Sequence, residues 1–148
     1  MPYHHTQTSP GGFRFGVIVF LIVIALFTAA LGDWIGLVIT ATVGLIVVAA
    51  MGVFGRFTTE VTGEGLEARF GWGWPRRTLR WEQATAVRIV RNRWWYGLGI
   101  RWFPGGTLWN VWGLDGVEFD LVKGRKLRIG TDEPEQLLAA LAGKVAVN

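Results

Sequence analysis

Cysteine is absent from the 148 residues, so the chain has no disulfide bonds, no thiolate metal ligands and no cysteine nucleophile. Histidine is scarce, because only His4 and His5 are present and both stand in a polar N-terminal stretch. Charge is nearly missing from one long region: between Phe15 and Phe54 the one charged residue is Asp33. These absences argue against a disulfide scaffold and against a cysteine- or histidine-based active site in the folded part.

The charge-poor region is too long for one membrane-spanning helix and suits two. As a single helix, residues 15–54 would extend roughly 60 Å, about twice the ~30 Å hydrocarbon thickness of a bilayer. The sequence therefore predicts a helical hairpin, with transmembrane spans at about 15–31 and 34–54 joined by Gly32 and Asp33. At the hairpin tip the Asp33 carboxylate lies among headgroups, whereas at mid-membrane it would cost about 3 kcal/mol.

Positive charges predict the orientation of this hairpin. Arg14 precedes the first span and Arg56 follows the second, while the turn has no Lys or Arg. The positive-inside rule then places both termini in the cytoplasm, as in a multi-pass cell-membrane protein with two spans. The alternative is a cleaved signal peptide, since residues 28–30 resemble a cleavage site. The length of the apolar run and the second span favour the hairpin.

Small residues recur every four positions in the second span, at Gly36, Thr40 and Gly44. This spacing lets helix backbones approach closely, either inside the hairpin or between copies of the chain. Neither span contains an ionisable residue, which argues against a channel or pump.

Beyond Arg56 the hydrophobic pattern changes to alternation, as in residues 117–121, which is typical of half-buried antiparallel strands. Glycine- and proline-containing turns separate the runs. About seven strands are predicted, near 57–61, 66–70, 77–81, 85–91, 98–103, 107–112 and 117–122, with 126–130 as a further one.

A helix is predicted to end the chain at about 133–145. Asp132 would be its N-cap, with Glu135 completing a capping box and Pro134 in the first turn. The predicted organisation is a polar tail (1–12), the transmembrane hairpin (13–55) and a cytoplasmic domain (56–146). That domain is predicted to be α+β and mainly β: an open barrel of about seven antiparallel strands, or two orthogonal sheets, capped by the C-terminal helix.

Three segments of the sequence resemble bacterial pleckstrin-homology-like domain proteins with an N-terminal membrane anchor. They are residues 105–113, the strand 116–121, and 128–137, where a strand leads through Gly130 and Thr131 into the helix. The resemblance covers roughly residues 56–146. It implies a pleckstrin-homology superfold without catalysis, and oligomer formation is known for some relatives.

The sequence departs from the phosphoinositide-binding members of that superfold. Those members carry Lys and Arg on the first strand pair and its loop, whereas here the loop 61–65 holds Glu64 and no cation. No bidentate arginine is available there for a phosphate, which argues against specific inositol-lipid binding.

Tryptophan is abundant, with eight of nine after Arg56, and several alternate with arginine. Amphipathic rings beside cations favour the headgroup region of an anionic leaflet. They also suit a protein interface, and stacked Trp–Arg pairs that only pack the fold are the third interpretation. The predicted membrane- or partner-contact residues are Trp72, Trp74, Arg76, Arg77, Arg91, Arg93, Trp94, Trp95 and Tyr96.

Catalytic signatures are missing: the sequence has no phosphate-binding glycine loop, nucleophile elbow or HExxH motif. Glu118 and Asp120 are expected on the wet face of a strand as solvated charges, and His4 and His5 as inert. No cofactor, metal, nucleic acid or small-molecule substrate is therefore expected. The predicted function is a non-enzymatic, membrane-tethered interaction module that binds a protein partner or its own copies. The alternative is a membrane-organising domain that contacts anionic lipid.

Overall fold

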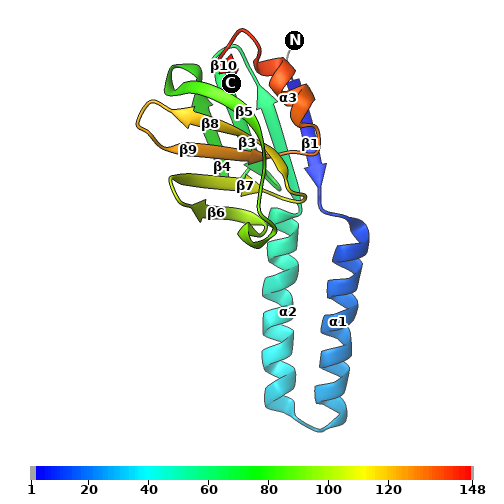
Figure 1. The fold of residues 1–148 in the computed structure, drawn as a ribbon. Coiled ribbons are helices and arrows are strands. Elements are labelled where there is room, and N and C mark those ends of the chain that lie inside the picture. The colour runs from blue at the N-terminus through cyan, green and yellow to red at the C-terminus, as the bar shows by residue number, and fades with distance from the viewer. Residues whose placement is uncertain (1–2, 148) are drawn as a thin grey trace.

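The computed structural model describes residues 3–147 and consists of a long helical hairpin and a β-rich head (Figure 1). Helix α1 spans Gly11–Ala30 and helix α2 spans Trp34–Phe54. Both are long and apolar enough to cross a membrane, and neither contains a buried residue. The two long apolar helices predicted from the charge-poor region are therefore confirmed. Asp33 caps α2 at the hairpin tip by accepting a hydrogen bond of 2.9 Å from the Gly36 N–H.

The segment predicted to be a polar tail belongs to the head. Strand β1 (Tyr3–Thr8) pairs antiparallel with β2 (Arg56–Val61) along its whole length. Its Gln7 is buried and donates a hydrogen bond of 3.0 Å to the Trp112 carbonyl. The tail prediction was wrong because β1 is an edge strand whose inward positions are largely polar, so the hydrophobic alternation that marks other strands is missing.

The pairing of β1 with β2 makes the hairpin an insertion between two neighbouring strands. Thr8 lies opposite Arg56, and the Ser9 N–H donates a hydrogen bond of 3.0 Å to the Gly55 carbonyl. Two residues separate β1 from α1, and one residue separates α2 from β2. The head is joined to the hairpin at two adjacent points without a flexible linker.

Two sheets form the head. Sheet A is antiparallel with the order β1-β2-β3-β4, where β3 is Gly65–Phe70 and β4 is Arg76–Arg80. Sheet B has the order β10-β5-β8-β9-β7-β6. Its strands are β5 (Ala84–Arg91), β6 (Gly99–Phe103), β7 (Gly106–Asn110), β8 (Asp115–Leu121), β9 (Lys126–Gly130) and β10 (Ala146–Val147). Two short 3-10 helices, η1 (Trp81–Gln83) and η2 (Trp94–Tyr96), flank β5.

The mainly-β character is confirmed, but the strand arrangement differs from the prediction. The two sheets do not close into a barrel, and two strand pairs, β7 with β9 and β10 with β5, are parallel. Alternation of apolar and polar residues locates strands one by one, but it carries no information about which strands become neighbours.

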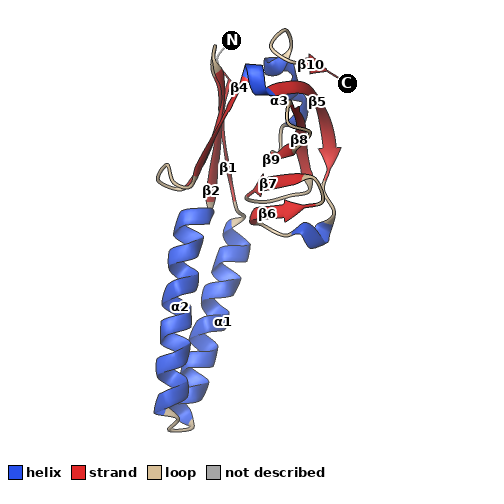
Figure 2. Cartoon of the chain, turned by 90° about the vertical axis from the view of Figure 1, so that its left-hand side faces the viewer, coloured by secondary structure: helices blue, strands red, loops and turns tan. Residues whose placement is uncertain are grey.

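The core lies between the two sheets, which face each other in Figure 2. Helix α3 (Pro134–Leu141) covers the end of the core farthest from the hairpin through its buried Leu137 and Leu141. It is shorter than the predicted helix because the chain turns at Gly143, whose φ is +80°. The predicted capping box is not formed: Glu133 is the N-cap, and its N–H donates to the Thr131 hydroxyl at 3.1 Å.

Aromatic rings connect the hairpin to this core. The Phe54 ring at the end of α2 lies 5.1 Å from that of Phe70, centroid to centroid. Phe70 in turn contacts Phe57 at 4.7 Å and Trp109 of sheet B at 5.7 Å. Such contacts add to the burial free energy of each ring, so they hold the head in a defined orientation on the hairpin.

Candidate interaction surface at the hairpin end of the head

The loop 71–75, between β3 and β4, lies against the end of α2. The Gly71 N–H donates a hydrogen bond of 3.0 Å to the Arg56 carbonyl. Gly71 has a φ of +45°, and a Cβ atom there would collide with the Val53 carbonyl, so glycine is required for this close approach. Trp72 is 91% exposed and Trp74 is 75% exposed. The loop is thus fixed to the helix end while its two indoles point into the surroundings.

Trp72 also shares a small cleft with Arg14 and Arg56, the two cations that bound the apolar stretches of the hairpin. Tryptophan and arginine at the ends of apolar helices are typical of the interface between hydrocarbon and water. Trp72 is therefore level with the boundary of the candidate membrane spans.

The second predicted segment, residues 91–96, lies at the same end of the head. Strand β5 runs toward the hairpin and η2 follows it, on the opposite side of the helix ends from the loop 71–75 (Figure 2). Trp94 is 77% exposed and Trp95 is also exposed, with their rings edge to face at 5.7 Å. The Arg93 guanidinium lies 5.1 Å from the Trp95 ring centroid, a cation–π contact.

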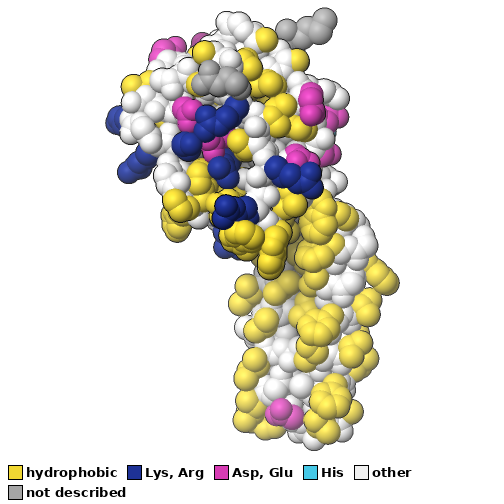
Figure 3. All heavy atoms as spheres, viewed as in Figure 1, with side chains coloured by type: hydrophobic (Ala, Val, Ile, Leu, Met, Phe, Trp, Pro, Cys, Tyr) yellow, Lys and Arg dark blue, Asp and Glu magenta, His cyan; other side chains and the backbone are white. Residues whose placement is uncertain are grey.

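The two Trp–Arg segments that the sequence analysis selected lie at the same end of the head, on opposite sides of the helix ends, and we call residues 71–77 and 91–96 the hairpin-end surface. In Figure 3, hydrophobic side chains gather at the end of the head next to the hairpin, beside Lys and Arg. Four predicted arginines are exposed, and no carboxylate within residues 3–147 forms an ion pair with any of them. They are Arg76, Arg77, Arg91 and Arg93.

Tyr96 differs from the other predicted contact residues because it is half-buried. Its ring stacks on Phe103 with a centroid separation of 6.0 Å, and the Arg128 guanidinium lies 5.9 Å from the Tyr96 centroid. Tyr96 therefore fastens η2 to sheet B. Trp102 was not selected as a contact residue, although its neighbour Arg101 repeats the Trp–Arg pattern, and it is 86% exposed on the edge strand β6.

Glu118 contradicts the expectation of a solvated charge. It is 1% exposed and accepts hydrogen bonds from Arg88, from Lys126 at 3.1 Å and from Arg128. Asp120 is also ion-paired, with Arg88 at 2.8 Å. The alternating face does point outward, but three long cationic side chains from β5 and β9 cover the carboxylate.

Burial alone would raise the pKa of the Glu118 carboxyl. The hydrogen bonds from Arg128 and Lys126, together with the charges of Arg128 and Arg88, outweigh burial and lower this pKa below its ordinary value of 4.5. The Arg128 guanidinium is in turn covered by the Phe103 ring, 4.2 Å from its centroid. The cluster is a closed network of paired charges and not an acid–base pair open to a substrate.

Of the three predicted packing residues of α2, Gly44 faces the other helix of the hairpin. Gly36, Thr40 and Gly44 are among the half-exposed positions of α2, while most of its residues are exposed. A Cβ at Gly44 would lie 3.9 Å from the Leu21 side chain of α1, and the space beside Gly36 is filled by Asp33. Gly44 therefore marks a close approach of the two helices within one hairpin, which fits one of the two roles that the spacing predicts.

His5, expected to be inert in a tail, is an ordered part of β1. Its Nε2 atom lies 2.7 Å from the Asp132 carboxylate and its Nδ1 atom 3.3 Å from that of Glu133. These contacts join β1 to the start of α3. Residues 3–147 contain no group of three or more His, Cys, Asp or Glu side chains placed to hold a metal ion.

Comparisons of the chain with protein-family models, with curated proteins and with solved structures find no match. The resemblance to pleckstrin-homology-like proteins therefore rests on the sequence pattern alone. What the chain does has to be argued from the hairpin and from the hairpin-end surface.

Proposed function

We propose that the chain is a non-catalytic membrane module whose hairpin crosses the cell membrane twice and whose head lies on the cytoplasmic leaflet. The loop 71–75 and residues 91–96 would contact the anionic headgroups of that leaflet. Arg14 and Arg56 at the head side of the spans, and the absence of cations at the hairpin tip, support this orientation.

One observation carries the proposal: Trp72 occupies the same cleft as Arg14 and Arg56, at the end of the apolar helices. A helix pair that fills the hydrocarbon core brings these three residues to the headgroup level. Because β1 and β2 continue into the helices without a linker, the head has little freedom to move the loop away. The η2 segment, at the same end of the head, is brought to the same leaflet.

The charges indicate what kind of surface is contacted. Each Lys or Arg near an anionic leaflet contributes about 1 kcal/mol at low salt, so each unpaired arginine of the hairpin-end surface that reaches the headgroups adds an attraction of that size. Exposed tryptophan rings suit the same depth, since their apolar bodies enter the interface while the indole N–H stays hydrated. Together they favour a lipid surface over a neutral protein surface.

The test uses nitroxide labels on the full-length chain in lipid nanodiscs. Because the chain has no cysteine, single variants Trp72→Cys and Trp94→Cys each take one label. The accessibility of a nitroxide to oxygen and to a water-soluble nickel complex reports its depth. We expect headgroup depth at both positions in bilayers that contain anionic lipid. A label at Glu135→Cys, on the exposed face of α3, should be fully aqueous.

A charge variant separates lipid attraction from simple proximity. With Arg76, Arg77, Arg91 and Arg93 all changed to Gln, the labels at positions 72 and 94 should become more accessible to the nickel complex. Bilayers of zwitterionic lipid should give the same increase without any substitution. Labels at 72 and 94 that are as aqueous as the one at 135 would refute contact with the leaflet.

A second function, binding of a protein partner or another copy, is favoured by the edge of sheet B. Among residues 3–147, strand β6 pairs with β7 alone and so forms an edge of sheet B, and its Trp102 is almost fully exposed. Open edges with an exposed aromatic side chain allow strand addition. Cross-linking of a Trp102→Cys variant in native membranes tests this function. A cross-linked product that contains a second protein or a second copy of the chain would support it, and recovery of the chain entirely as the uncross-linked monomer would contradict it.

The finer description of the head as pleckstrin-homology-like is also a proposal. Two facing sheets and a helix across one end of the core support it. The parallel pairing of β7 with β9 is a departure from a simple antiparallel order.

A further inference from the structure

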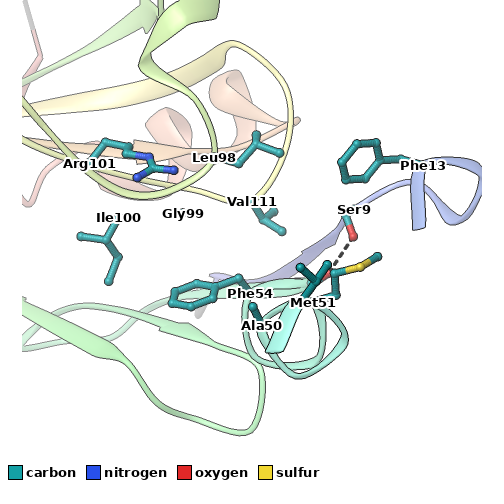
Figure 4. A pocket seen from close by; sticks show the side chains of 12 residues that line it. Ser9, Phe13, Ala50, Met51, Phe54, Leu98, Gly99, Ile100, Arg101 and Val111 are labelled. Atoms are coloured by element: carbon teal, nitrogen blue, oxygen red, sulfur yellow. Dashed lines mark hydrogen bonds between the residues drawn. The ribbon is translucent and has the colours of Figure 1, made fainter. Parts of the chain in front are cut away.

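An apolar pocket lies where the hairpin meets the head. One wall comes from the helix ends, with Phe13 of α1 and Ala50 and Phe54 of α2 among its residues, and the opposite wall comes from β6, with Ile100 and Arg101 (Figure 4). The pocket has a volume of about 380 Å³. Val47 and Met51 also line it, so the pocket borders the apolar surface of α2.

The polar groups of this pocket are few. The Ser9 hydroxyl is directed at the Gly55 carbonyl, 3.5 Å away, as the dashed line in Figure 4 marks. Among the lining residues Arg101 is the charged one, and no carboxylate within residues 3–147 forms an ion pair with it. A polar metabolite would find almost no hydrogen-bond partners here, so the lining selects a hydrocarbon group.

The size and the position identify which hydrocarbon. An apolar cavity of about 150 Å³ is enough to bind benzene, so this pocket has room for a longer aliphatic segment. Ala50 and Phe54 lie in the last turns of an apolar helix, so the pocket continues the surface that faces acyl chains when the hairpin is in a membrane. The nearest abundant hydrocarbon is then the acyl chain of a phospholipid in the same leaflet.

Arg101 supplies the group that a phospholipid requires at its other end. In Figure 4 its guanidinium extends toward Leu98, on the wall of the pocket that the head forms opposite the helix ends. Guanidinium binds phosphate through two parallel hydrogen bonds, which fix the orientation of the lipid. An acyl chain inserted between the helix ends and β6 leaves its phosphate on this side.

From this geometry we infer that the pocket holds one acyl chain of a phospholipid of the cytoplasmic leaflet, whose phosphate is bound by Arg101. The inference rests on the part of the proposed function that puts the hairpin in the membrane, and it goes further by naming a single bound lipid. Each methylene group buried in the pocket adds to the affinity for the lipid. Such a lipid should stay bound when the surrounding bilayer is removed.

The test counts phospholipids by native mass spectrometry on full-length chain extracted from membranes and washed in detergent. The variant Ala50→Phe fills the pocket, and Ala49→Phe, its neighbour on α2, adds the same volume outside the lining. We expect one phospholipid per chain in the wild type and in Ala49→Phe, and none in Ala50→Phe. Intrinsic tryptophan fluorescence shows whether each variant is folded.

A second pair of variants tests the phosphate contact without changing the core. Losing charge-assisted hydrogen bonds weakens binding by about ten- to a hundredfold, so Arg101→Gln should lose the lipid at detergent concentrations that the wild type withstands. Arg80→Gln, an exposed position on β4, should behave as the wild type. No phospholipid on the wild type, or equal retention in Ala50→Phe, overturns the inference. Equal retention in Arg101→Gln overturns the phosphate assignment.

These outcomes differ from those of the proposed function. If the labels at 72 and 94 lie at headgroup depth but no lipid is retained, only the pocket inference fails. If a lipid is retained while those labels are fully aqueous, only contact of the loops with the leaflet fails.

Discussion

Arginine has two different surroundings in two regions of the head. On the outer face of sheet B, Arg88 and Arg128 are paired with the buried Glu118, and Arg128 is also covered by an aromatic ring. On the hairpin-end surface, Arg91 and Arg93 have no carboxylate partner within residues 3–147. Arg88 and Arg91 are only three residues apart on β5, so the contrast occurs within one strand.

The difference shows what each region contributes. Paired cations with a buried carboxylate are part of the folded structure, because removing one partner leaves an uncompensated buried charge. Unpaired exposed cations contribute little to folding and keep their full charge for an external anion. The four exposed arginines beside exposed tryptophans are the residues that the proposed function assigns to binding. Substitutions of the paired arginines should lower the free energy of unfolding, and substitutions of the exposed arginines should weaken binding to the leaflet and leave that free energy unchanged.

The largest expected effect is on folding, from Glu118→Gln. The neutral amide leaves Arg88, Lys126 and Arg128 close together without their shared anion. Breaking a buried ion pair of this kind costs about 3–5 kcal/mol in the free energy of unfolding. Urea denaturation of the full-length chain in detergent, followed by tryptophan fluorescence, measures this loss.

The exposed Glu82→Gln is the control, and its free energy of unfolding should stay within about 0.5 kcal/mol of the wild type. A loss below about 1 kcal/mol for Glu118→Gln would mean that the cluster is hydrated and not a closed network.

A matched pair on β5 tests the contrast itself. Arg88→Gln removes hydrogen bonds to two carboxylates and should lower the free energy of unfolding by about 1.5–3 kcal/mol. Arg91→Gln, on the same strand, should change it by less than about 0.5 kcal/mol. The same urea titration measures both variants. Equal effects of the two substitutions would remove the distinction between structural and free arginines.

The sequence is sufficient to predict the hairpin and most strands, for a simple physical reason. A candidate membrane span is a long continuous apolar run, and a half-buried strand is an alternation of apolar and polar residues. Both patterns are local, so residues 34–54 and 117–121 can be recognised without reference to the rest of the chain. The two Trp–Arg segments are visible for the same reason. The sequence does not reveal that both segments lie at one end of the head, since that depends on how the strands pair.

Three features could not be read from local patterns because they depend on residues far apart in the sequence. Strand β1 is identified as a strand by its partner β2, which follows 48 or more residues later across the hairpin. Glu118 is buried by Arg88, thirty positions earlier, so its burial cannot be inferred from alternation within β8. The carboxylate of Asp132, predicted as an N-cap, instead lies 2.7 Å from His5, which is 127 positions earlier in the sequence.

The smallest expected effect is the pH dependence of the free energy of unfolding, which should differ between variants of the paired and of the exposed charges. The folded head lowers the pKa of Glu118 below its ordinary value of 4.5, so this carboxylate stabilises the head above that pH. The contribution is lost as pH falls through the lowered pKa of the folded state.

Other carboxylates titrate in the same range, so the informative quantity is the difference in the free energy of unfolding between the wild type and Glu118→Gln, here called the gap. We expect the gap, measured by urea denaturation, to be constant from pH 7 to about 5 and to narrow below about 4.5. The gap between the wild type and Arg91→Gln should stay near zero throughout, because Arg91 has no carboxylate partner among the described residues. A gap for Glu118→Gln that is unchanged down to pH 3 would contradict the assignment of the lowered pKa to the ion-pair cluster.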